Sequence, residues 1–291
     1  MSGWAFSRGV GFVLLLAFVA LCPQASRSES REPVCQNGVG SFTATASSGV
    51  SVYVGPRKVH GFASRDCESI LSWQGQQLIA IPRAWRLDVD GMDIDLGLGV
   101  LVLALEFKTA ETDRSTTYRI YSLAKPVRLL REITGGGSFS AADADLDGHV
   151  EIWASDAAAI AGLEDIPLDA FDSPPTAVLR FEKRRLVDVS VEFQNDFDGQ
   201  IAKLRSQIDP KLSIAFKSGD KESSPGSSEY SHQLALTKIR VVEIVLAYLY
   251  SGREAEAWRT LGDLWPTADY GRIKAVLAAA HARGLSARLM P

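Results

Sequence analysis

The chain has 291 residues with 31 Lys and Arg against 35 Asp and Glu, so its formal net charge is −4. Hydrophobic residues make up 46% and charged residues 23%, which is an ordinary globular mixture. These values exclude a disordered, a collagen-like or a disulfide-dense protein, and they give no electrostatic reason to expect nucleic-acid binding.

The N-terminal segment has the pattern of a secretory signal peptide. Arg8 precedes an apolar run over residues 10–21, which is too short to span a bilayer of about 30 Å. A small-residue site follows, so we expect residues 1–25 to be removed after Ala25. Two alternatives are a retained membrane anchor and a lipoprotein that is modified at Cys22. The expected location is periplasmic or secreted, with no membrane span after signal removal.

Two cysteines remain beyond the predicted leader, Cys35 and Cys67. An even pair in an oxidising compartment predicts a disulfide. The alternative, a cysteine nucleophile or a zinc site, lacks any CxxC or HxxxH spacing.

Residues 35–195 are predicted to form a β-rich domain. Short β-branched and aromatic runs alternate with turn signals. These runs cover residues 50–54, 99–107, 117–123, 127–133, 150–153, 177–181 and 186–193. The segment 177–193 has the pattern of a hairpin with its charged tip at 182–185, and Gly135–Gly137 predicts a tight turn.

Helical patterns replace the strand patterns after residue 195. The region 196–228 is predicted to hold a helix over 198–208, capped by Asp198, and a flexible linker over 217–228. The region 229–291 is predicted to hold three amphipathic helices over 234–250, 254–264 and 269–283, with Gly252 and Gly284 as C-terminal stops.

The most informative stretch is the acidic loop that begins at Asp143. Carboxylates stand at positions 1, 3, 5 and 9, a glycine stands at position 6, and the residue at position 7 is suited to offer its backbone carbonyl. Ca²⁺ prefers six to eight oxygen ligands, and a cation relieves the repulsion among clustered acids. The predicted ligands are Asp143, Asp145, Asp147, the carbonyl of His149, and Glu151. The alternative is a solvated acidic turn.

An EF-hand is excluded because it requires Glu at position 12, where this chain has Ala154. The loop instead resembles the calcium-binding hairpin loops of the FG-GAP/VCBS repeat families, which have the pattern D-x-[DN]-x-D-G-x-x-[DE]. The resemblance covers residues 80–190 and implies an exported protein with Ca²⁺ as cofactor. A partial copy of this acidic pattern begins at Asp88 and continues through Asp90 and Asp93.

A closed propeller needs four to eight blades of four strands each, and the β-rich region is long enough for only about three blades. We therefore expect an α+β protein in which FG-GAP-like hairpins form a sandwich or a partial propeller, followed by a small helical region. In that helical region, Val245, Tyr248, Gly252, Ala257 and Leu261 resemble a tetratricopeptide hairpin, which implies a protein partner.

No nucleophile elbow, phosphate loop or zinc-protease motif is present, and the four histidines are scattered. No catalytic residue is predicted, although whether the protein is an enzyme stays open. The favoured hypothesis is an exported calcium-binding interaction or scaffold protein. The alternatives are a subunit of a cell-envelope assembly and a hydrolase of extracellular polymers.

Overall fold

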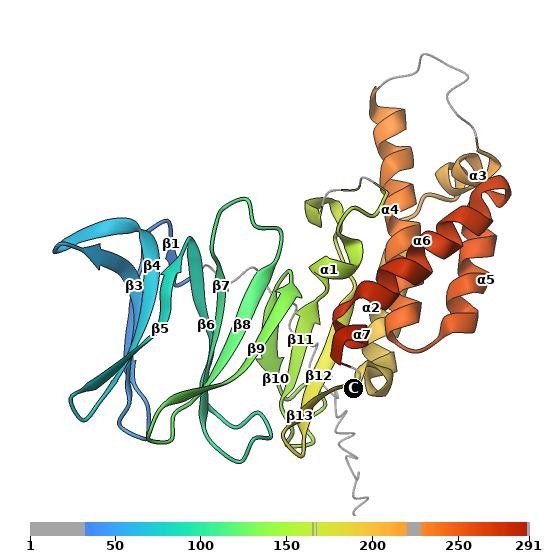
Figure 1. Ribbon diagram of the computed structural model, residues 1–291. Coiled ribbons are helices and arrows are strands. Elements are labelled where there is room, and N and C mark those ends of the chain that lie inside the picture. Colours follow the sequence, from blue (N-terminus) through green and yellow to red (C-terminus); the bar gives the residue numbers. More distant parts are fainter. Residues whose placement is uncertain (1–32, 165, 167, 220–227, 290–291) are drawn as a thin grey trace, which may run out of the picture. The chain divides into compact units, whose positions relative to one another are not determined.

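A computed structural model describes residues 33–164, 166, 168–219 and 228–289 (Figure 1). The predicted signal peptide and the centre of the predicted linker lie outside these residues. Within them, three antiparallel sheets and several helices are present, which confirms the α+β class in its general form. None of the described helices combines the length and the apolar composition needed to cross a membrane.

Each sheet contains four strands that follow one another in the chain and lie side by side in the same order. The N-terminal sheet contains β2 (Phe42–Thr45), β3 (Ser51–Val59), β4 (Phe62–Trp73) and β5 (Gln76–Ala84). The central sheet contains β6 (Arg86–Ile94), β7 (Val102–Lys108), β8 (Thr116–Ser122) and β9 (Arg128–Gly136), with β1 (Cys35–Gln36) added beside β6. The C-terminal sheet contains β10 (Phe139–Ala142), β11 (Glu151–Ser155), β12 (Thr176–Glu182) and β13 (Arg185–Asp188).

The central sheet has apolar cores on both faces, and strand β7 shows why. Successive side chains of a strand point to opposite faces. Val102 and Ala104 join the core toward the C-terminal sheet. Leu103, Leu105 and Phe107 join the core toward the N-terminal sheet. The strand is therefore almost continuously apolar rather than alternating, as expected when both faces are covered.

The predicted disulfide is confirmed, since Cys35 is bonded to Cys67. Cys35 lies on β1 of the central sheet and Cys67 on β4 of the N-terminal sheet. The bond therefore joins two sheets across their shared core, in which both residues are fully buried.

The helices follow the C-terminal sheet in the chain. They are α1 (Ala157–Ile160), α2 (Gln194–Ser206), α3 (Pro210–Ser218), α4 (Ser228–Tyr250), α5 (Glu254–Leu264), α6 (Tyr270–Arg283) and α7 (Leu285–Leu289), with short 3₁₀ turns at η1 (Leu168–Ala170), η2 (Ser190–Phe193) and η3 (Thr267–Asp269). Side chains of α2 and α4, including Phe197, Ile201 and Ile244, share one core with the C-terminal sheet. Another core is built mainly from α4, α5 and α6.

Asp156, which directly follows β11, forms hydrogen bonds with three of these helices. Its buried carboxylate caps α1 by accepting a hydrogen bond from the Ala159 amide at 3.0 Å. It also accepts one from the Tyr250 hydroxyl at 2.7 Å and one from the Leu285 amide. One carboxylate thus satisfies donors from α1, α4 and α7.

Several sequence-based boundaries are wrong in detail. Residues 190–193 form η2 rather than the end of a strand, and α2 begins at Gln194, so Asp198 does not cap it. Asp198 instead pairs with Arg253. Gly135 and Gly136 end strand β9, although Gly135 does have a positive φ of 92°. The predicted linker begins inside a helix, because α3 extends to Ser218.

Candidate metal centre

The acidic loop joins β10 to β11, the first two strands of the C-terminal sheet. Its chain reversal depends on two residues in the left-handed region, Leu146 at φ 62° and Gly148 at φ 89°. A Cβ atom added at Gly148 would meet nothing within 4 Å. Glycine is therefore needed here for its backbone conformation and not for space, which agrees with its predicted place at the turn.

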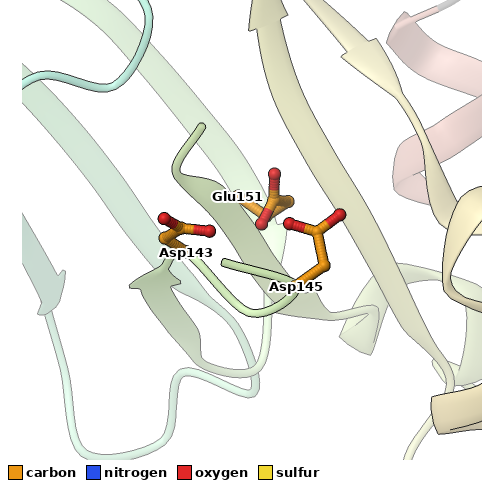
Figure 2. A group of neighbouring side chains, drawn as sticks. All are labelled: Asp143, Asp145 and Glu151. Atoms are coloured by element: carbon orange, nitrogen blue, oxygen red, sulfur yellow. The ribbon is translucent and has the colours of Figure 1, made fainter. Parts of the chain in front are cut away.

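Three of the predicted ligands converge (Figure 2). Oxygen atoms of Asp143, Asp145 and Glu151 all lie within 4.8 Å of one another. Asp143 and Asp145 come from the loop, whereas Glu151 is the first residue of β11. The tight loop and the strand that follows it thus direct carboxylates toward a common centre.

Glu151 is the buried member of this group, with none of its surface exposed. Its Oε2 accepts a hydrogen bond from the Ala144 amide at 3.2 Å, but its Oε1 is buried without any hydrogen-bond partner. Burial raises the pKa of Glu151, and the nearby Asp145 and Asp147 raise it further. An orphaned buried carboxylate oxygen is costly unless a cation satisfies it.

Asp143 repeats this arrangement. Its Oδ2 accepts a hydrogen bond from the Gly148 amide at 3.1 Å, while its Oδ1 is buried without a partner. The loop therefore uses one oxygen of each of two carboxylates to hold its own backbone. The other oxygen of each, Oδ1 of Asp143 and Oε1 of Glu151, is left without a hydrogen bond.

Asp147 lies outside the convergent group. Its Oδ1 accepts a hydrogen bond from the His149 amide at 2.7 Å and lies 3.1 Å from Nδ1 of the same residue. The hydrogen bond from the His149 amide lowers the pKa of Asp147. Through these two contacts Asp147 fixes the shape of the loop. Ligation of a metal by Asp147 and by the His149 carbonyl stays a prediction.

Arg180 is not among the predicted site residues, yet its guanidinium lies beside the loop. Its Nη1 lies 3.6 Å from Oε1 of Glu151 and 3.9 Å from Oδ2 of Asp147, beyond hydrogen-bond reach of both. Its Nη2 is much closer to Glu192, at 2.7 Å. The Arg180 side chain is only 12% exposed. The sequence does hold one indication of its role, because Arg180 is a basic residue within the otherwise apolar run 177–181.

The prediction of a second, partial copy of the loop at residues 88–93 is wrong. Asp88, Asp90 and Asp93 all lie within strand β6 and not in a turn. Asp90 accepts hydrogen bonds from the Tyr118 hydroxyl and, at 3.0 Å, from the Ala141 amide. Its role is to join the central and C-terminal sheets.

The helical residues singled out from the sequence are mostly buried. Val245, Ala257 and Leu261 are fully buried in the core of α4, α5 and α6. Helices α4 and α5 are joined by three residues, 251–253, and Gly252 has the positive φ of 75° expected of a helix stop. The resemblance to a tetratricopeptide hairpin stays a prediction.

The donor set fits a hard divalent cation. Two carboxylates from the loop and one from the first residue of β11 offer oxygen ligands. Ca²⁺ completes its shell with backbone carbonyls and water. Comparisons of the chain with protein-family models, with curated proteins and with solved structures give no match.

Proposed function

We propose that the protein is an exported calcium-binding scaffold protein in which Ca²⁺ is bound by the loop between β10 and β11. The observation that carries this proposal is the buried Oε1 of Glu151, which has no hydrogen bond and lies beside the carboxylates of Asp143 and Asp145. When bound, the cation would neutralise these carboxylates and fix the hairpin. Since the loop is formed only in the folded chain, binding stabilises the folded state.

The sheet topology supports the FG-GAP-like part of the proposal. Three successive sheets each contain a four-stranded meander, and four antiparallel strands are also the unit of a propeller blade. The acidic loop occupies a strand-to-strand hairpin and runs directly into β11, as the resemblance implies. We propose a partial, open arrangement of such units.

Export and partner binding complete the proposed function. The Cys35–Cys67 disulfide is of the kind that persists in oxidising compartments, which supports a periplasmic or secreted location. Helices α4, α5 and α6 form a core largely of their own. We propose that this helical region binds a protein partner.

Thermal unfolding with Ca²⁺ and with a chelator tests the metal site. At a Ca²⁺ concentration of 100 Kd the linkage relation gives about 2.7 kcal/mol of stabilisation. This corresponds to a rise of about 5–10 °C in Tm for a chain of this size. Isothermal titration of the chelator-treated protein gives the stoichiometry, which we expect to be one ion per chain.

Two substitutions localise the binding. Glu151→Gln and Asp145→Asn each remove a carboxylate of the cluster and should abolish the Ca²⁺-dependent rise in Tm. Glu111→Gln is the matched control, since Glu111 is exposed and lies in the loop between β7 and β8. Identical midpoints of the unmodified protein in Ca²⁺ and in chelator would refute the metal site.

A further inference from the structure

A hollow of about 250 Å³ opens between the central and C-terminal sheets. Part of its wall comes from three connections: Leu98 and Val100 from the chain between β6 and β7, Lys125 from the turn between β8 and β9, and Arg184 from the turn between β12 and β13. The end of β8 and the start of β9 supply the rest, including Arg128 and Leu130. In a meander, every second connection lies at the same end of the sheet. The hollow is therefore at the end of the C-terminal sheet that also carries the acidic loop, but it shares no residue with that loop.

The charge of the lining is one-sided. Three cations, Lys125, Arg128 and Arg184, contribute to it, and none of the lining side chains is acidic. This is unexpected in a chain with more acidic than basic residues. Among the described residues, none of these three side chains makes a hydrogen bond or an ion pair, whereas Arg119 and Arg180 each have a carboxylate partner.

The remaining surface of the hollow is mainly apolar. Leu98, Val100 and Leu130 are partly buried and pack against the core shared by the two sheets, so their inner sides are fixed while their outer sides face the hollow. Cations without partners around an apolar floor attract an anion that also carries an apolar body. The volume equals that of roughly eight water molecules, which favours a small organic acid over a long-chain lipid.

We propose that this hollow is a binding site for a small organic carboxylate with an apolar body, whose carboxylate is held by Arg128 and Arg184. Bound there, the acid would contact connections from both sheets and so hold their ends together. Each guanidinium would supply a charge-assisted hydrogen bond to the carboxylate.

Titration calorimetry and NMR on the chelator-treated protein test this site with octanoate as the probe. We expect octanoate to bind at one site, octylammonium not to bind, and inorganic phosphate, which lacks an apolar body, to bind at least tenfold more weakly. Arg128→Gln and Arg184→Gln should each weaken octanoate binding about tenfold. Arg128→Lys, which keeps the charge, should retain most of the affinity.

Arg114→Gln is the matched control, because Arg114 is an exposed cation in the connection between β7 and β8, at the opposite end of the central sheet. It should bind octanoate like the unmodified protein. An unchanged Tm in the two Gln variants would show that their loss of affinity is local to the site. The proposal is overturned if octanoate does not bind, if octylammonium binds equally well, or if the two Gln variants keep full affinity.

Discussion

The carboxylate of Glu106 accepts a hydrogen bond from the backbone amide of Phe139 at 2.9 Å. Glu106 lies on β7 of the central sheet, and Phe139 lies on β10, the edge strand of the C-terminal sheet. Two residues along β10, the Ala141 amide donates to Asp90 in the same way. Two carboxylates thus take the place of a neighbouring strand along this edge, where free amides would otherwise be unsatisfied.

This contact predicts a pH dependence of stability. Burial raises the pKa of Glu106 to about 7, and the neighbouring Asp90 and Asp88 add to the rise against the opposing effects of the Phe139 amide and Arg86. In the unfolded chain the pKa is near 4.5, so the folded state holds an additional proton between these values. The free energy of unfolding should therefore fall as pH rises from about 4.5 to about 7, by up to about 3 kcal/mol.

Urea unfolding of the unmodified protein and of Glu106→Gln across this pH range isolates the contribution of Glu106. Glutamine keeps an acceptor for the Phe139 amide but does not titrate. The difference in unfolding free energy between the two proteins should change with pH, and the variant should gain relative stability toward pH 7. Parallel curves would show that Glu106 does not carry the effect.

Arg180 is predicted to oppose calcium binding. Its guanidinium lies 3.6 Å from Glu151 and carries a positive charge beside the proposed ion. Arg180→Gln should therefore bind Ca²⁺ about tenfold more tightly, or ~1.4 kcal/mol. The same variant should be less stable in chelator, because Glu151 loses its nearest positive charge. Titration calorimetry measures the first effect and thermal unfolding the second.

The control for this prediction is Arg180→Lys, which keeps the positive charge and should bind Ca²⁺ with nearly unchanged affinity. If Arg180→Gln binds Ca²⁺ no more tightly than the unmodified protein, the guanidinium does not compete with the ion.

Loss of the disulfide should destabilise the β-rich part of the molecule. Cys35 and Cys67 are 32 residues apart in sequence, for which the chain-entropy relation gives about 3–4 kcal/mol. Guanidinium unfolding of the unmodified protein and of Cys35→Ser/Cys67→Ser should show this difference. Equal midpoints would mean that the cross-link does not stabilise the fold.

The buried Asp156 should be among the most sensitive positions of the helical region. Asp156→Ala leaves the Tyr250 hydroxyl and the Ala159 and Leu285 amides without their acceptor. We expect a loss of about 3 kcal/mol or more in unfolding free energy. Tyr250→Phe removes only one of these donors and should cost about 1 kcal/mol. Equal losses in the two variants would contradict the shared role of Asp156.

Local patterns account for what could be predicted from the sequence. Helix α5 matches the predicted 254–264 because its apolar spacing is regular and acidic residues occupy its first turn. The acidic loop was found for a similar reason, since its residues are adjacent in the chain. Cys35 and Cys67 were the only pair left after the predicted leader.

The missed features depend on contacts between distant residues. The sequence predicts a partial copy of the acidic loop at residues that form strand β6, because Asp88 and Asp90 repeat the spacing of the first two acids of the loop. Only the fold shows that Asp90 faces an edge strand 51 residues further along the chain. Arg180 was overlooked for the same reason, because its carboxylate neighbours come from other segments.

The two-sided burial of β7 has a consequence for how the protein can vary. Inserting or deleting a single residue before Val102 would turn every side chain of the strand to the opposite face. Glu106 would then lie among Val52, Val54 and Leu71, far from the Phe139 amide. Changes of length should therefore be tolerated in the connections between strands, while the length of β7 itself is fixed by the two different environments it separates.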